Sequence, residues 1–221
     1  MTTSATTAAT RILFVGNSYT SRNDLPRLVS ELAAAAPQPR EVHTQAIVAG
    51  GASLKRHWNA GKVQAALAAT PWDYVVLQEQ STLPFKSSQR YHENVRLFHP
   101  EIARHGAKIV LYLTWSRQQT PERQDEITRA VQAIGAEVGA LVVPVGPVWH
   151  RAMHWDPSLK LYVDDGSHPT AAGSYLAACV FLIALFDQKP SGWSVADKLK
   201  LDRGTAESLH VVASDVIRRR G

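Results

Sequence analysis

The chain has 221 residues, with 24 lysines and arginines against 19 aspartates and glutamates, so its formal net charge is +5. Hydrophobic residues make up 45% of the chain and charged residues 19%, which is typical of a folded domain and excludes general disorder. The single cysteine, Cys179, excludes an intramolecular disulfide framework and a CxxC metal site. The length predicts one domain, over residues 11–221.

The opening ten residues, MTTSATTAAT, are polar and contain no basic residue, so they predict a disordered tail rather than a signal peptide, and hence a cytoplasmic protein. The longest apolar run, residues 177–186, is shorter than the roughly 20 residues of a membrane-spanning helix. Basic residues alternate with acidic ones outside Arg218-Arg219-Arg220. We therefore expect neither nucleic acid nor a membrane as a partner.

Short apolar runs alternate with segments of helical spacing along the chain. The runs are residues 11–15, 42–48, 74–77, 108–113 and 141–145, and a long loop follows the fifth. Their near-continuous hydrophobicity predicts parallel strands buried on both faces. Helical spacing covers residues 25–36, 54–69, 91–105, 122–138, 170–186 and 206–220. This alternation predicts an α/β fold, a three-layer α/β/α sandwich with a five-stranded parallel sheet. The last helix either packs against its own domain and closes it, or contacts a second copy of the chain in a homo-oligomer.

Ligands of open parallel sheets bind at the carboxyl ends of the strands, so the residues that follow each run are the candidates for a site. After the first run, Gly16 permits a sharp turn that places Ser18 near a helix N-terminus, where free N–H groups favour negative charge. Ser18 is therefore a candidate nucleophile. Alternatively, Ser18, Thr20 or Ser21 only caps the following helix. The phosphate-binding glycine motifs and the GxSxG elbow are absent.

The loop after the fifth run ends in Asp165-Gly-Ser-His168. A turn of this spacing brings the Asp165 carboxylate onto the His168 imidazole, which fixes the tautomer and leaves the other ring nitrogen as a general base. Asp164 is the alternative acid. The alternative interpretation is a surface turn with a capping aspartate.

Two other strand ends offer donors for an oxyanion. Gly51 can present a free backbone N–H, and Gln78 and Gln80 each carry a side-chain NH2. The plainer alternatives are a flexible turn and solvated glutamines. Tyr19 and Trp115 lie at the same expected edge, either as a platform for a substrate sugar or as packing residues.

The order of these motifs resembles that of the SGNH (GDSL-type) hydrolases, which are serine esterases and lipases with a flavodoxin-like fold. GNS (residues 16–18) matches the family's G-D-S block, GAS (51–53) its second block, and DGSH (165–168) its D-x-x-H block. The third block, G-x-N-D in the family, reads LQEQS (77–81) here. Together, GNSYT, LQEQS and DGSHP resemble a divergent bacterial branch.

The resemblance implies that Ser18 is the nucleophile, Asp165 and His168 are the acid and the base, and the N–H groups of Ser18 and Gly51 bind the oxyanion. Gln80 then replaces the family's asparagine donor, and Gln78 is the second candidate for this role. It implies hydrolysis of short-chain carboxylic esters, including O-acetyl groups on carbohydrate, through an acyl-enzyme and without cofactor or metal.

Two other functions stay open. A carbohydrate-binding module could retain the fold without catalysis. A metal-dependent hydrolase could use His150 and His154, which have the HExxH spacing, although Arg151 stands where such a site has glutamate.

Overall fold

Five parallel strands form the centre of the structure, a computed structural model that describes residues 9–191 and 193–218. The strand order is β2-β1-β3-β4-β5. The strands are β1 (Thr10–Gly16), β2 (Val42–Val48), β3 (Tyr74–Leu77), β4 (Lys108–Tyr112) and β5 (Leu141–Val143). The predicted five-stranded parallel sheet is confirmed. Of the expected tail, residues 1–8 lie outside the described residues, and Thr10 already belongs to β1.

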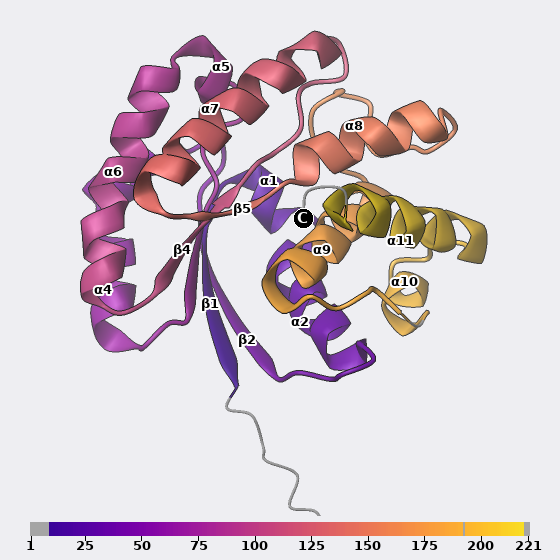
Figure 1. The fold of residues 1–221 in the computed structure, drawn as a ribbon, viewed down its shortest axis with the longest axis horizontal. Helices are drawn as coiled ribbons and strands as arrows, with labels where there is room; N and C mark the ends of the chain where they lie inside the picture. The colour runs from indigo at the N-terminus through magenta and orange to yellow at the C-terminus, as the bar shows by residue number, and fades with distance from the viewer. Residues whose placement is uncertain (1–8, 192, 219–221) are drawn as a thin grey trace, which may run out of the picture.

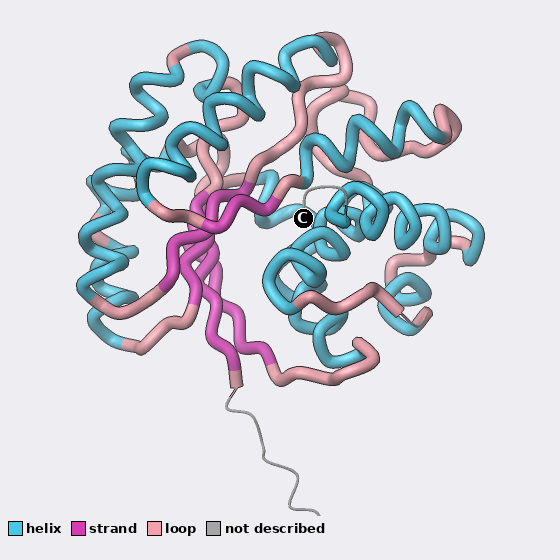
Figure 2. Tube along the Cα trace, viewed as in Figure 1, coloured by secondary structure: helices cyan, strands magenta, loops and turns pink. Residues whose placement is uncertain are grey.

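Helices cover both faces of the sheet, which gives three layers (Figures 1 and 2). One face carries α2 (Leu25–Ala35), α8 (Val145–Trp155), α9 (Ala171–Phe186), α10 (Ser194–Lys198) and α11 (Arg203–Arg218). The other carries α3 (Leu54–Ala60), α4 (Lys62–Ala69), α5 (Leu83–Lys86), α6 (Ser88–Arg104) and α7 (Gln124–Val138). Short helical segments lie in two of the connections: α1 (Ser18–Ser21) and η1 (Arg22–Asp24) precede α2, and η2 (Pro121–Arg123) precedes α7.

Strand side chains alternate between two cores. In β1, Ile12 and Phe14 pack on the side of α2 and α9, while Leu13 and Val15 pack on the side of α3 and α6. Both faces of β1, β3 and β4 are buried, so no polar alternation appears in these three strands, whereas the edge strand β2 is mostly exposed.

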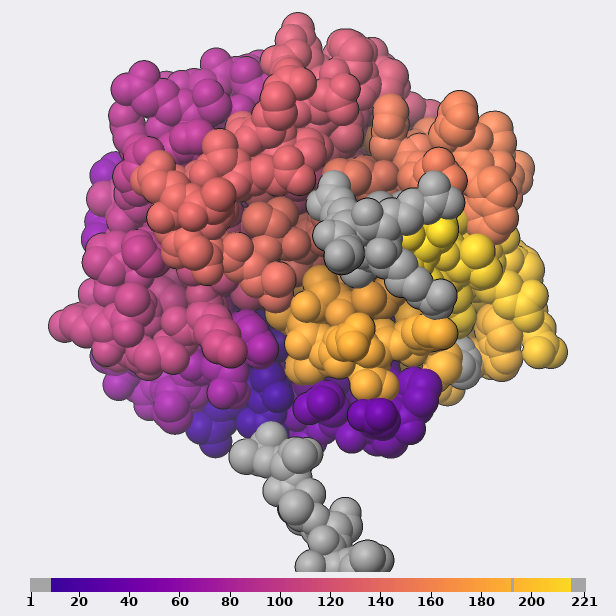
Figure 3. Space-filling model, viewed as in Figure 1, coloured from indigo at the N-terminus to yellow at the C-terminus, as the bar shows by residue number. Residues whose placement is uncertain are grey.

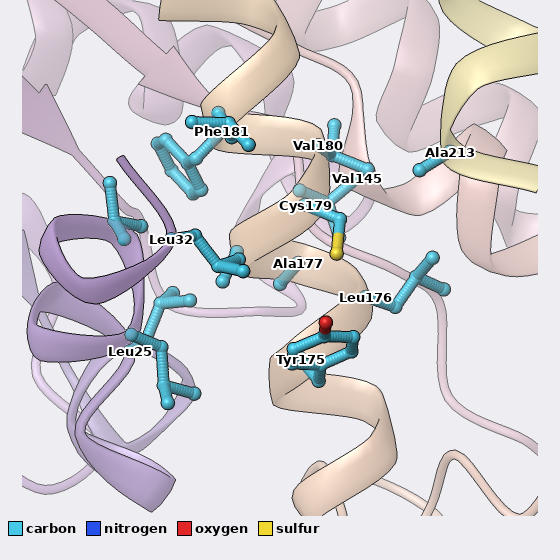
Figure 4. Packing of buried hydrophobic residues seen from close by; sticks show 14 of the residues in the cluster. Leu25, Leu32, Val145, Tyr175, Leu176, Ala177, Cys179, Val180, Phe181 and Ala213 are labelled. Atoms are coloured by element: carbon cyan, nitrogen blue, oxygen red, sulfur yellow. The ribbon is translucent and has the colours of Figure 1, made fainter. Parts of the chain in front are cut away.

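The apolar run 177–186 belongs to α9, which is enclosed by other elements. It contacts α2, α8 and α11, and Figure 4 shows Tyr175, Cys179 and Phe181 among residues of these neighbours. In the space-filling view, the orange surface around α9 is bordered by purple, salmon and yellow segments from the rest of the chain (Figure 3). Among the described residues, no helix is long and apolar enough to cross a membrane.

Two predicted elements differ from the structure. The helix expected over residues 54–69 is broken at Gly61, whose φ of 68° ends α3 and precedes α4. The strand expected over 141–145 ends at Val143, because Pro144 cannot donate to the ladder and instead precedes α8. Helix α8 therefore occupies the start of the expected loop.

The chain order creates a crevice at one edge of the sheet. The connection from β1 to β2 runs through α2 on one face, whereas the connection from β2 to β3 runs through α3 and α4 on the other. Strand order reverses beside β1, where open α/β sheets bind ligands. The residues after β1, β2 and β3 meet there.

Candidate active site

Ser18, His168 and Asp165 form one chain of hydrogen bonds. The Ser18 Oγ lies 2.8 Å from His168 Nε2, and His168 Nδ1 lies 2.5 Å from Asp165 Oδ2. Ser18 comes from the turn after β1, while the other two residues come from the loop before α9. Asp165, rather than Asp164, contacts the imidazole. With Nδ1–H donating to the carboxylate, Nε2 is free to accept the Ser18 hydroxyl proton.

The Asp165 carboxylate also holds the turn that carries His168. Its Oδ1 accepts the backbone N–H groups of Ser167 at 2.8 Å and of His168 at 2.9 Å. The His168 N–H, then its imidazole, and the Ser167 N–H hold the pKa of Asp165 well below its usual range. Asp165 therefore stays ionised and fixes both the backbone and the ring of His168.

The segment after His168 anchors this turn to a rigid helix. The Thr170 Oγ1 accepts the Gly173 N–H at 3.2 Å and so caps α9. From the other side, the Asn23 side-chain NH2 donates to the Thr170 carbonyl and to Ser174 Oγ. The helix expected over residues 170–186 is confirmed as α9, and its start ties the His168 turn to the segment that follows Ser18.

Asn17, rather than a serine or threonine, caps the first turn. Its Oδ1 accepts the Tyr19 N–H, its Nδ2 donates to the Ala52 carbonyl at 3.1 Å, and its backbone N–H donates to Gln78 Oε1 at 2.9 Å. This buried side chain thus joins the loops after β1, β2 and β3. The Ser18 hydroxyl is left for His168, so the capping alternative for Ser18 is wrong.

Gln78 is a structural residue. Its side chain is completely buried, its Oε1 accepts from Asn17 N and Thr20 Oγ1, and its Nε2 donates to the Glu79 carbonyl. A Cβ on Gly16 would lie 2.5 Å from Gln78 Oε1, so any other residue there would displace the buried Gln78 side chain. The prediction of Gln78 as an oxyanion donor is wrong, because no substrate atom can reach its amide.

The loops at this edge of the sheet contain N–H donors for which the described residues supply no acceptor. Among them are the backbone N–H of Ser18, the backbone N–H of Gly51 and the Nε2 of Gln80. Gly51 has a φ of 61°, and open space surrounds it. The Gln80 Oε1 accepts from both Thr82 N and Thr82 Oγ1 at 3.0 Å, so the orientation of this amide leaves Nε2 as the available donor.

Tyr19 and Trp115 are packing residues, so their prediction as substrate-binding residues is wrong. Both are buried, and their rings stack with centroids 4.7 Å apart. Trp115 stacks in turn on Trp149, at 3.9 Å. The Tyr19 hydroxyl bonds Ser167 Oγ at 2.7 Å, and Trp115 Nε1 donates to the Ser167 carbonyl at 2.9 Å. We define these three rings as the aromatic stack; it supports the turn that carries His168.

Two buried ionisable residues were missed by the sequence reasoning. Glu79 is 5% exposed and accepts three N–H bonds, and burial raises its pKa. The His57 Nε2 donates to the Gly16 carbonyl at 2.7 Å, and burial lowers its pKa. A charged residue two positions after a buried strand is the only sequence signal for Glu79. Nothing in the sequence pattern distinguishes His57.

Two cavities lie near these loops. One, of about 470 Å³, includes Ser53 and Gln80 among its lining residues. The other, of about 530 Å³, is lined by residues of α8, including His150 and His154, and by Gln118. No group of three or more histidine, cysteine or acidic side chains within residues 9–191 and 193–218 is placed to hold a metal ion.

No family model matches the chain, and no curated protein matches it. Solved structures do match. A DUF4886 family protein from Bacteroides uniformis has a TM-score of 0.75 and 19% identity, covering 95% of each chain. A catalytic mutant of Axe2, an acetylxylan esterase from Geobacillus stearothermophilus, has a TM-score of 0.64 and 18% identity, covering 82% of this chain and 96% of that chain. At these identities the likeness shows the fold alone.

A protein of Slackia heliotrinireducens assigned to the SGNH hydrolases has a TM-score of 0.68 to this chain. It is 32% identical, and the match covers 80% of this chain and 100% of that chain. The two chains share this identity over the whole length of the relative, and the fold of this chain is a five-stranded sheet of order 2-1-3-4-5. The two proteins are therefore members of one family. The chain belongs to the SGNH hydrolase family.

Proposed function

We propose that this protein is a serine esterase that hydrolyses short-chain carboxylic esters through an acyl-enzyme. The observation that supports the proposal most directly is the 2.8 Å contact between Ser18 Oγ and His168 Nε2, with His168 oriented by Asp165. A binding module has no chemical need for a serine hydroxyl, an imidazole and a carboxylate in one hydrogen-bonded line.

In the proposed reaction, Ser18 Oγ attacks the ester carbonyl carbon and its proton passes to His168 Nε2. The oxyanion is bound by the N–H groups of Ser18 and Gly51 and by Gln80 Nε2. His168 then gives the proton to the leaving alcohol. Water attacks the acyl-enzyme, its proton passes to Nε2, and this proton returns to Ser18 as the carboxylic acid leaves. Asp165 stays ionised throughout and stabilises the imidazolium.

The surroundings of Gln80 favour a short acyl group and a polar alcohol. In the lining of the cavity of about 470 Å³, polar and charged residues such as Ser53, Gln80 and Asn94 outnumber the two apolar residues, Leu83 and Leu97. A long acyl chain needs an extended apolar channel to leave water. The proposed substrates are therefore acetyl and other short esters, including O-acetyl groups on carbohydrate.

The test compares two serines of the same short segment. Intact mass is measured after treatment with a fluorophosphonate, on the wild type, on Ser18→Ala and on Ser21→Ala, which changes an exposed serine three positions away. We expect one adduct on the wild type and on Ser21→Ala and none on Ser18→Ala. The value of kcat for 4-nitrophenyl acetate should fall at least about 10,000-fold in Ser18→Ala alone. A folded wild type that forms no adduct would overturn the proposal.

A further inference from the structure

Glu79 is a buried carboxylate that no cation neutralises among the described residues. Its Oε1 accepts the backbone N–H of Leu54 at 3.0 Å and that of Gln80 at 2.7 Å, and its Oε2 accepts Asn94 Nδ2 at 2.8 Å. Only 5% of the residue is exposed. Burying a charge away from water is costly, and here three N–H donors directed at one group offset that cost.

The three donors come from separate parts of the chain. Leu54 is the first residue of α3 and follows the loop that contains Gly51. Gln80 belongs to the loop after β3, and Asn94 lies in the middle of the 17-residue helix α6. The carboxylate therefore fixes two loops to each other and both of them to a long helix. These are the loops that carry the unused Gly51 N–H and Gln80 Nε2.

A carboxylate matches this set of donors, because all three neighbours approach with N–H groups and it accepts on both of its oxygens. Both backbone N–H groups bond the same oxygen, Oε1, so a glutamine would keep these two bonds through its single oxygen. Its NH2 would bond the Asn94 side chain once that amide turned over to present Oδ1. The two backbone N–H groups therefore need an acceptor at this position, and a leucine of similar size would supply none.

We propose that Glu79 is the positioning residue of the oxyanion hole: through the N–H groups of Leu54 and Gln80 it sets the separation between Gly51 N and Gln80 Nε2. This inference rests on the proposed esterase function. Glu79 itself touches no reacting atom. Because the two donors meet negative charge only in the transition state, their misplacement lowers kcat and leaves KM nearly unchanged.

The test removes the acceptor at position 79 and then supplies a neutral one. Glu79→Leu leaves the N–H groups of Leu54 and Gln80 without their partner, and kcat for an acetyl ester should fall at least about 100-fold, the effect of losing one oxyanion donor. Glu79→Gln keeps an oxygen for both N–H groups, and its NH2 can donate to the turned-over Asn94 amide. We expect Glu79→Gln to stay within about tenfold of the wild type. Glu41→Gln, at an exposed position before β2, is the control.

A second measurement does not depend on catalysis. Hydrogen–deuterium exchange of the amides in residues 50–54 and 80–82 should speed up at least about tenfold in Glu79→Leu and stay near the wild-type rate in Glu79→Gln. Unchanged exchange in Glu79→Leu would overturn the inference, and so would a loss of kcat in Glu79→Gln as large as that in Glu79→Leu. A wild type without fluorophosphonate adduct would refute the esterase function, whereas exchange would still decide whether Glu79 fixes the two loops.

Discussion

Replacing Asn17 by aspartate, the residue of the family's G-D-S block, should destabilise this protein. The Asn17 side chain is 3% exposed and lies between a donor and an acceptor. Its Oδ1 accepts the Tyr19 N–H, and its Nδ2 donates to the Ala52 carbonyl at 3.1 Å. An ionised aspartate would keep the first bond, but it would place a negative oxygen against the Ala52 carbonyl oxygen.

The size of the effect follows from these two contacts. A buried carbonyl left without its donor costs about 1–3 kcal/mol. A negative charge at the start of α1 returns about 0.3–1 kcal/mol through the free N–H groups of the first turn. The net loss is about 1–2 kcal/mol, which corresponds to a fall in Tm of roughly 2–8 °C for a chain of this length.

Urea denaturation of the wild type and of Asn17→Asp at pH 7 measures this loss as a difference in the free energy of unfolding. The exposed residue Asn59 on α3 provides the matched control, and Asn59→Asp should change stability by no more than about 0.5 kcal/mol. The Asn17→Asp deficit should also shrink in acid, because a protonated carboxyl can donate to Ala52. If Asn17→Asp equalled or exceeded the wild type in stability at pH 7, the reasoning would be refuted.

Three further predictions follow from contacts described above. Gly173→Ala should destabilise the protein by about 1–2 kcal/mol in urea, because the new Cβ would lie 2.4 Å from Trp149 Cη2; unchanged stability would contradict the placement of this ring. Burial lowers the pKa of His57 from its ordinary value of 6.5, so its contribution to stability is complete above that pH and is lost as the pH falls below it. The free energy of unfolding should therefore fall more steeply from about pH 7 to about pH 5 in the wild type than in His57→Gln, and parallel curves would argue against this role. Asp165→Asn should lower kcat roughly 10,000-fold in an acetyl-ester assay with the fold retained, because the imidazole of His168 loses its orienting acceptor.

Most of the sheet was predictable because β1, β3 and β4 are buried on both faces. Such strands read as continuous apolar runs, and β3 begins and ends where the sequence pattern places it. The edge strand β2 also has the expected bounds, although most of its residues are exposed. The breaks at Gly61 and Pro144 were missed for local reasons. A lone glycine does not interrupt helical spacing, and the apolar residues on both sides of Pro144 read as one run.

Within the site, the local relationships were predictable and the long-range ones were not. Asp165 and His168 are three residues apart, so one turn joins them. Gln78 and Gln80 are two positions apart, so the alternation of side chains along a strand would place both on the same face. The sequence pattern therefore cannot tell which of the two is buried. The difference is that the Gln78 N–H still bonds the Val15 carbonyl as part of the sheet, whereas the chain has left the sheet by Gln80.

Burial of the aromatic residues depends on partners far away in the sequence. Trp115 is fixed by a carbonyl 52 residues further on, and Tyr19 by a hydroxyl 148 residues further on. No local pattern records such contacts. The prediction that these rings bind substrate therefore failed, although their position at the correct edge of the sheet was right.

The aromatic stack has a consequence for the order of folding. Its three rings come from the turn after β1, the segment after β4 and helix α8, and it supports a turn that follows all of them in the chain. Contacts of such long sequence separation form late, because the closure entropy of a large loop opposes them until most of the sheet exists. A chain emerging from the ribosome therefore holds its serine next to no base until nearly all of the fold has been synthesised. Stacked tryptophans at the centre of this last step make intrinsic fluorescence a direct kinetic reporter of when the reactive geometry appears.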